Sequence, residues 1–322
     1  MPPVPVVPSA ARPRVAVTGV TGFIGARLLP ELRARGYDVL TLSRRAGAAA
    51  PGGPGAADAT AHWNPARGEL DASALDGVVA AIHLAGENIG QRWTDARRRQ
   101  ILASRVQGTA LLARTLGALR PRPRVLVSVS AVGYYGDGGD RELDETSPSG
   151  QGFLAEVVRQ WEAAADPARD AGIRVVHPRL GVVLGVDGGA LARLLPLFRL
   201  GLGGRLGDGR QWMSWLARDD AVRALAFLAE EPALAGAVNV VAPEPVRNAA
   251  FTRTLARVLH RPAPWVVPAF ALELLYGQMA RETLLWGQRV QSRRLPDAGF
   301  TFLQPTLEEA LRAEIGGAVE GK

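Results

Sequence analysis

Three glycines near the amino terminus are spaced three residues apart. Residues 15–25 read Val-Ala-Val-Thr-Gly-Val-Thr-Gly-Phe-Ile-Gly, a short apolar run followed by Gly-x-x-Gly-x-x-Gly. Glycines permit a tight turn and let a pyrophosphate approach backbone N–H groups at the positive end of the next helix. The turn could instead merely pack a helix on a sheet, and by chance a chain with 37 glycines in 322 residues contains the bare pattern about 0.5 times. Its place between a strand and a helix favours dinucleotide binding, through Gly19, Thr21, Gly22, Phe23, Ile24 and Gly25.

About 20 residues after this turn, the next apolar run ends in Ser43-Arg44-Arg45. In an NAD site an acidic residue would stand here and bind the ribose hydroxyls, whereas arginine suits a 2′-phosphate. We therefore expect NADP(H) as the cofactor, with Ser43, Arg44 and Arg45 beside its 2′-phosphate. A solvated arginine pair is the simpler alternative.

The elements that would position these residues follow an alternating pattern. From Arg14 onward, apolar runs of strand length alternate with longer helix-period segments, which is typical of a parallel sheet with crossover helices. We expect an α/β fold: a Rossmann-like doubly wound parallel sheet with a smaller C-terminal substrate domain. Pro30 should kink the first helix or shift its start. The predicted strands are 15–18, 38–43, 79–84, 125–128, 175–177 and 238–241; the predicted helices are 23–35, 94–119, 153–171 and 219–230; residues 46–61 should form a flexible surface loop.

The chain should divide into three parts: a disordered tail, an NADP-binding Rossmann domain and a smaller C-terminal domain. The tail lacks the basic start of a signal peptide. No apolar stretch approaches the roughly 20 residues that span a bilayer, and the longest, Trp265 to Tyr276, is broken by Pro268 and Glu273. A cytoplasmic location without a membrane partner is therefore expected. The expected parts are 1–12 (tail), 13–185 with 215–242 (Rossmann domain) and 186–214 with 243–322 (smaller domain).

Missing residue types exclude several chemistries. The chain has no cysteine, which excludes disulfides and thiolate nucleophiles. Lys322 is the only lysine, so the body of the fold cannot hold a Walker-type phosphate loop or a pyridoxal Schiff base. The four histidines show no close pairing, and no metal is expected. A net charge of +7 could suggest nucleic acid, but the arginines are scattered and indicate a composition bias, so we expect no nucleic-acid partner.

Further short motifs follow one another along the chain. The principal ones are His-Leu-Ala-Gly-Glu-Asn-Ile (83–89), Arg-Trp-Thr (92–94), Ser-Ala-Val-Gly-Tyr-Tyr-Gly (130–136), Trp-Glu (161–162), Arg-Leu-Gly-Val-Val-Leu-Gly (179–185), Phe-Arg-Leu-Gly-Leu-Gly-Gly (198–204) and Ala-Gly-Phe (298–300). Together with the glycine turn, they make the chain from Arg14 to Leu311 resemble the extended short-chain dehydrogenase/reductases. Within these it is similar to the atypical NAD(P)-dependent epimerase-like family of the YfcH type.

The resemblance implies further cofactor contacts. Leu84, Ala85 and Gly86 end a strand at the place where the family's backbone packs along the adenine ribose. Glu87 begins the following loop, and Arg105 occupies a position at which many extended members carry an Asn that supports the active site. Glu87 and Arg105 could also be an ordinary surface pair.

The resemblance also reveals a missing catalytic pair. Typical members use a Ser or Thr after the fifth strand and a Tyr-x-x-x-Lys on the next helix, where the Lys lowers the Tyr pKa. Phe153 and Val157 occupy the Tyr and Lys positions here, so the ordinary proton relay is absent. Ser130 could hydrogen-bond a carbonyl and Tyr135 could donate a proton. Weaker candidates are Tyr134 and Glu156.

Two functions remain open. The first is an NADP(H)-binding oxidoreductase or sugar-nucleotide epimerase-like enzyme with a non-standard proton relay and a small-molecule substrate. The second is a non-catalytic NADP(H)-binding regulatory protein. The missing Tyr and Lys favour the second, whereas a Gly-rich second domain with a tryptophan pair favours a ligand pocket and so the first. Arg210, Trp212 and Trp215 could border the substrate cleft, and aromatic packing between domains is an equal alternative for them. The chain could form a homodimer.

Overall fold

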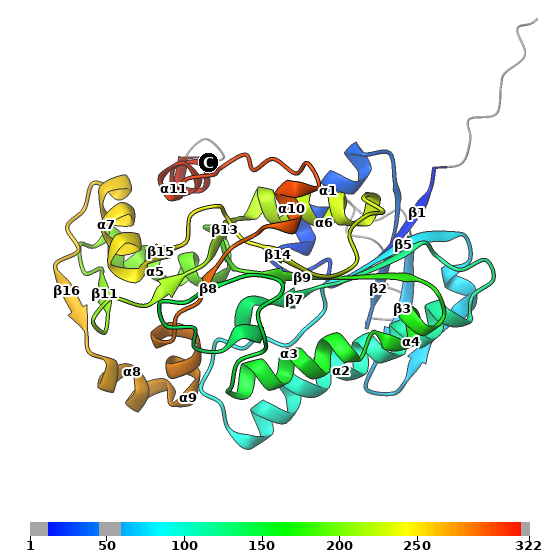
Figure 1. Cartoon of the computed structure of the whole chain (residues 1–322), viewed down its shortest axis with the longest axis horizontal. Helices are drawn as coiled ribbons and strands as arrows, with labels where there is room; N and C mark the ends of the chain where they lie inside the picture. The colour runs from blue at the N-terminus through cyan, green and yellow to red at the C-terminus, as the bar shows by residue number, and fades with distance from the viewer. Residues whose placement is uncertain (1–11, 45–58, 317–322) are drawn as a thin grey trace, which may run out of the picture.

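The computed structural model describes residues 12–44 and 59–316. Its centre is a nine-stranded sheet in the order β14-β9-β6-β5-β1-β2-β3-β4, with β7 beside β9 (Figure 1). All pairings in this sheet are parallel except that of β3 with β4. The strands are β1 (Arg14–Thr18), β2 (Asp38–Ser43), β3 (Ala59–Asn64), β4 (Glu69–Leu70), β5 (Val78–His83), β6 (Val125–Ser128), β7 (Ser130–Ala131), β9 (Arg174–Leu180) and β14 (Gly236–Val240).

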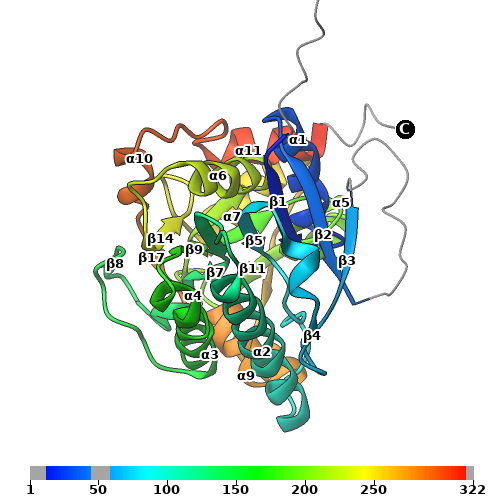
Figure 2. The same cartoon turned by 90° about the vertical axis from the view of Figure 1, so that its right-hand side faces the viewer.

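Helices cover both faces of the sheet (Figures 1 and 2). Successive residues of β1 point to opposite faces, so Val15 and Val17 join Leu28 in one core while Ala16 joins Leu112 in the other. Burial on both faces explains why the strands are apolar throughout. The first face carries α1 (Gly25–Ala34) and α6 (Arg218–Glu230), and the second carries α2 (Asp95–Ala118), α3 (Phe153–Ala163) and α4 (Asp166–Asp170).

A second group of elements, on the left in Figure 1, has its own core. Leu191, Phe198, Trp215, Phe251 and Leu311 are among the buried residues of this core. Its helices are α5 (Gly189–Arg199), α7 (Asn248–Leu259), α8 (Ala269–Tyr276), α9 (Gln278–Ala280), a π-turn (Arg281–Leu285) and α11 (Leu307–Gly316), with α10 (Arg294–Asp297) beside β14. Short strand pairs are β10 (Val182–Leu184) with β13 (Trp215–Ala217), β11 (Gly204–Leu206) with β16 (Trp265–Val267), β12 (Trp212–Met213) with β15 (Val246–Arg247), and β8 (Glu142–Leu143) with β17 (Arg289–Val290).

The predicted fold class is confirmed, and three local predictions are wrong. The helix expected over 153–171 is two helices, because Pro167 lacks an N–H and belongs to the first turn of α4. The first helix begins at Gly25, which leaves Phe23 and Ile24 in the turn, and Pro30 lies inside it. Residues 59–61, expected to belong to a loop, begin strand β3.

Several expectations concern residues outside the described ranges. These are the tail up to residue 11, loop residues 46–58, Arg45 and Lys322. The domain boundaries stay a prediction. Across 12–44 and 59–316, no helix is long and apolar enough to cross a membrane.

Candidate functional site

The glycine turn between β1 and α1 is sterically tight. Gly19 has a φ of +72°, and a Cβ at Gly25 would stand only 2.2 Å from the carbonyl oxygen of Gly19. Helix α1 has no side-chain cap at Ile24 and no acidic residue in its first turn. A helix start of this kind leaves backbone N–H groups and positive partial charge for an anion. Thr21 and Gly22 are exposed on the same turn.

Thr18 joins this turn to the loop after β5. Its Oγ1 accepts the N–H groups of Leu84 (3.1 Å) and Ala85 (3.2 Å) and lies 2.7 Å from Nδ1 of His83. The two lone pairs of this hydroxyl already accept these N–H groups, so its one proton is left to donate to Nδ1. Nδ1 of His83 must therefore be unprotonated. Burial, with a smaller effect of the Arg105 charge, lowers the pKa of His83 to about 4. Neutral His83 therefore orients the Thr18 hydroxyl. That hydroxyl holds Leu84 and Ala85, two of the predicted cofactor contacts, beside the turn.

The protein is expected to lose about 3 kcal/mol of stability as the pH falls from about 6.5 to about 4, through His83 alone. Over this range the unfolded chain takes up a proton on His83, whereas the folded chain keeps the ring neutral. Urea unfolding at several pH values would measure the effect. His83→Asn keeps an acceptor for Thr18 without a titratable group, so its stability should fall less steeply with acid. Equal slopes for the two proteins would contradict the assignment.

The end of β2 reaches the same edge of the sheet. Thr18 pairs with Leu42 in the parallel register of β1 and β2, so Ser43, the last residue of β2, and Arg44 after it lie next to the glycine turn. Arg44 is exposed and has no carboxylate partner among the described residues. Its guanidinium is therefore available to a phosphate, while Arg45 lies outside the described ranges.

Glu87 and Arg105 do not form an ion pair with each other. Arg105 Nη1 donates to the carbonyl of Glu87 (3.0 Å), and its guanidinium carbon lies 5.0 Å from the Trp161 ring centre. A Cβ at Gly86 would lie 3.3 Å from this guanidinium, so the arginine packs directly against the loop that follows β5. Burial lowers the pKa of Arg105 to about 10, and it keeps its charge at neutral pH. The Glu87 carboxylate pairs instead with Arg97 at 3.0 Å.

Ser130 and Tyr135 belong to one buried polar network. Ser130 Oγ donates to Glu162 Oε1 at 2.6 Å. Arg179 binds both oxygens of the same carboxylate, at 2.8 and 2.9 Å, and donates to the Tyr135 hydroxyl at 3.1 Å. That hydroxyl in turn donates to Asn239 Oδ1 at 2.8 Å. Tyr135 is only 1% exposed, so both of its hydrogen-bonding directions are used within the protein.

Arg179 controls the charge state of this network. Burial acts to raise the pKa of Glu162, but the hydrogen bonds and charge of Arg179 hold it below its ordinary value. Burial raises the pKa of Tyr135, and Arg179 only partly offsets this. The network therefore contains a carboxylate and a neutral phenol. In the sequence, Glu162 and Arg179 stand out only as members of two short motifs, because their pairing depends on how α3 lies against the sheet.

Phe153 and Val157, at the positions of the missing Tyr and Lys, also have apolar surroundings in the structure. Phe153 packs edge to face against Trp93, with ring centres 5.0 Å apart, and Val157 is buried in the same cluster. Glu156 is half-buried and bonded to Arg159 and Gln160, which removes it from the candidate site. Val157 carries no charge in place of the Lys, and the guanidinium carbon of Arg98 lies 5.8 Å from the Phe153 ring centre.

The start of α3 is completed by a distant carboxylate. Gly152 provides no side-chain cap, and Glu282 accepts the N–H groups of Phe153 (3.0 Å) and Leu154 (2.8 Å). Glu282 is only 5% exposed. The π-turn of the second group of elements thus fixes the helix that carries positions 153 and 157.

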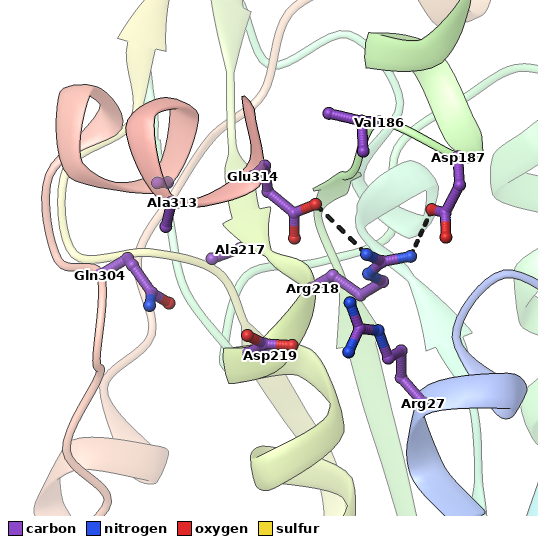
Figure 3. Close-up of a pocket in the computed structure, with 10 residues that line it drawn as sticks. Arg27, Val186, Asp187, Ala217, Arg218, Asp219, Gln304, Ala313 and Glu314 are labelled. Atoms are coloured by element: carbon purple, nitrogen blue, oxygen red, sulfur yellow. Dashed lines mark hydrogen bonds and ion pairs between the residues drawn. The ribbon is translucent and has the colours of Figure 1, made fainter. Parts of the chain in front are cut away.

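A cavity of about 280 Å³ is lined by Arg27 of α1, the start of α6 and the end of α11 (Figure 3). Arg218 projects into it between Asp187 and Glu314, and Figure 3 shows Arg27 beside Arg218. The guanidinium carbon of Arg218 also lies 5.0 Å from the ring centre of Phe23. Burial raises the pKa of Glu314, against the opposing effect of Arg218. Sequence reasoning missed this cavity because its residues come from four distant segments.

The expected border of a substrate cleft is only partly present. Trp215 is fully buried in the core around Phe251, so its placement at a cleft is wrong. Trp212 is half-buried, with its Nε1 donating to Asp140 at 2.9 Å. Arg210 lines a second cavity of about 220 Å³. Among the described residues, no group of three or more acidic or histidine side chains could hold a metal.

Two segments of the chain match known family models. Residues 15–241 match the NAD dependent epimerase/dehydratase family, and residues 267–314 match a domain of unknown function, DUF1731. An epimerase family protein of Mycobacterium tuberculosis is 44% identical over 298 residues, which cover 92% of this chain and 96% of that protein. The human epimerase family protein SDR39U1 is 38% identical over 303 residues, covering 93% and 98%.

Solved structures show the same fold. A crystal structure of human SDR39U1 (isoform 2) with NADPH matches with a TM-score of 0.83 at 36% identity, covering 94% of this chain and 99% of that one. UDP-glucose 4-epimerase of Thermotoga maritima with UDP-glucose matches with a TM-score of 0.77 at 17% identity, covering 95% and 99%.

Proposed function

The chain belongs to the NAD dependent epimerase/dehydratase family, and on that premise we propose that it binds NADP(H) and exchanges a hydride with a small-molecule substrate through a non-standard proton relay. The observation that carries the proposal is the uncapped start of α1 behind the tight glycine turn. The family agrees with the resemblance to extended short-chain dehydrogenase/reductases, and the finer likeness to YfcH-type members stays a prediction.

The described residues fit NADP(H) in two ways. The positive end of α1 at the turn from Gly19 to Gly25 suits a pyrophosphate, although the N–H of Gly22 already donates to the Gly19 carbonyl (3.0 Å). Exposed Arg44 suits a 2′-phosphate. The human relative solved with NADPH supports the same choice. Leu84, Ala85 and Gly86, held by Thr18 and Arg105, would carry the ribose side of the site. A bound nicotinamide supplies or accepts the hydride.

Ser130 and Glu162 are the groups we assign to proton transfer. Since Ser130 already donates its proton to Glu162, it offers lone pairs rather than a proton to the substrate. A substrate hydroxyl can therefore pass its proton to Ser130 Oγ as the Ser130 proton moves to Glu162, and the reverse step returns it. Tyr135 is bonded to Arg179 and Asn239 on both sides, so we assign it to positioning Arg179.

The protein is expected to bind NADPH about 10- to 150-fold more tightly than NADH. One charge-assisted bond from Arg44 to the 2′-phosphate is worth about 1.5–3 kcal/mol, which corresponds to that ratio. Calorimetric titration with both cofactors would measure the preference. Arg44→Ala should remove most of it and leave NADH binding nearly unchanged, because the glycine turn still binds the pyrophosphate.

Arg99→Ala, at another exposed arginine, is the matched control and should keep the preference. Equal affinity of the unmodified protein for both cofactors would refute the choice of NADP(H). No binding of either cofactor would overturn the dinucleotide site itself.

A non-catalytic regulatory role remains the second candidate. Its support is the apolar packing of Phe153 and Val157, which puts neither a hydroxyl nor a cation at the positions of the family's Tyr and Lys. Such a protein would bind NADP(H) with the same preference and turn over none of the substrates tested.

A further inference from the structure

One end of the molecule exposes an unusual number of large apolar side chains. It is the end that carries β11, β16 and α8, on the left in Figure 1. Their exposed fractions range from 46% to 77%, whereas monomeric proteins rarely expose contiguous apolar areas of this kind. We call this surface the apolar ridge; it consists of Leu197, Leu200, Leu202, Trp265, Val266, Phe270, Leu274 and Leu275.

The elements that carry these side chains are neighbours in the fold or in the chain. Strand β16 pairs with β11, and a Cβ at Gly201 would lie 3.5 Å from Pro262. Helix α8 follows β16 directly and buries only Leu272. Five ridge residues therefore come from the apolar run Trp265 to Tyr276, which the proposed dinucleotide site does not use: Trp265, Val266, Phe270, Leu274 and Leu275.

The charges around the ridge are mainly positive. Arg92 donates to the carbonyls of Leu274 and Leu275, and Arg261 donates to those of Arg199 and His260. Arg92, Arg199 and Arg261 are exposed, and none has a carboxylate partner in the part of the chain that the structure describes. The one acid within the ridge, Glu273, is paired with Arg281 at 2.9 Å.

We propose that the apolar ridge docks on an anionic lipid surface. Projecting Trp, Phe and Leu side chains beside unneutralised arginines are the features by which proteins insert shallowly into the interface of acidic membranes. A two-fold contact between copies of this chain would bring the same arginines together, which disfavours self-association through the ridge. The two cavities described above are lined by other residues, and the ridge side chains themselves are at least 46% exposed.

This proposal departs from the expectation of no membrane partner. That expectation rested on the lack of a spanning stretch, which a surface contact does not need. The proposal is also independent of the cofactor, since none of the ridge residues belongs to the dinucleotide site.

Vesicle flotation with the full chain tests the proposal. The protein should float with vesicles of equal parts phosphatidylcholine and phosphatidylglycerol, and much less with phosphatidylcholine alone. Phe270→Ser with Leu274→Ser should weaken this binding at least about tenfold, because two large apolar contacts are lost. Arg199→Gln with Arg261→Gln should weaken it and reduce its salt dependence. Leu303→Ser, at an exposed leucine outside the ridge, is the control and should bind as the unmodified protein does.

NADPH titration and circular dichroism would show that each variant is folded. The proposal is overturned by no flotation with either vesicle, by equal flotation with both, or by ridge variants that float unchanged. It is also overturned if light scattering shows a dimer of the unmodified protein that the ridge variant converts to monomers, since a second copy then covers the ridge.

Discussion

With NADPH as the hydride donor, reduction of aldehydes, quinones and UDP- or GDP-sugars is expected to be about 10²- to 10⁴-fold slower than in family members with Tyr-x-x-x-Lys. That range is the usual contribution of general acid–base catalysis, and here Phe153 and Val157 supply neither a hydroxyl nor a cation. Loss of NADPH absorbance would measure the rates. An extended short-chain dehydrogenase that has the Tyr and Lys, assayed with the same substrates, provides the reference.

Variants of the buried network separate the two candidate functions. If a slow activity exists, Ser130→Ala and Glu162→Gln should both abolish it while NADPH affinity is kept, whereas Tyr135→Phe should reduce it less. Full activity in Ser130→Ala and Tyr135→Phe would show that the catalytic assignments are wrong. Rapid turnover by the unmodified protein would show that a different group transfers the proton. No turnover with any substrate favours the regulatory role.

Arg179→Leu is expected to destabilise the fold by about 3–5 kcal/mol. The guanidinium is the only cation bonded to Glu162 among the described residues, and the two side chains are 5% and 14% exposed. Removal of one partner of such a pair leaves the other charge buried without compensation. Urea unfolding at neutral pH would measure the free energy of unfolding.

Arg159→Leu is the matched control, because Arg159 pairs with Glu156 on the surface of the same helix. Surface pairs contribute about 0–1 kcal/mol. The double variant Arg179→Leu with Glu162→Leu should recover much of the loss, since an apolar pair of similar volume has no buried charge. If Arg179→Leu alone lowers the free energy of unfolding by only about 1 kcal/mol, the Glu162 carboxylate becomes hydrated when its partner is removed.

The central sheet was predictable because its strands are buried on both faces. Asp38–Ser43 and Val125–Ser128 were predicted with their observed bounds, as continuous apolar runs between helical segments. β3 was missed because Trp63 is its only buried residue and its start lies in an Ala- and Gly-rich segment. The strands of two or three residues around β11 and β16 are too short to produce a periodic pattern.

The site divides in the same way between local and distant features. The glycine turn is local, so its residues and the following helix could be read directly from the sequence. The Ser130–Glu162–Arg179 network joins β7, α3 and β9, and no spacing along the chain indicates that these side chains meet. Its members are ordinary surface residue types, and only the packing of α3 on the sheet makes them buried. The same holds for Arg218, which reaches Glu314 across 96 residues.

The carboxylate of Glu282 has a consequence for how the chain can be divided. The segment that matches the family model ends at residue 241, yet α3 within it depends on a hydrogen-bond acceptor 41 positions beyond that limit. Strand β17 likewise supplies Arg289 and Val290 to β8 from outside the matched segment. A fragment cut at the boundary of the family match would expose two N–H groups at the start of α3 and the open edge of β8. A fragment that ends at residue 241 is therefore expected to be less stable than the whole chain, and the dinucleotide half of the molecule should be expressed and unfolded together with the rest.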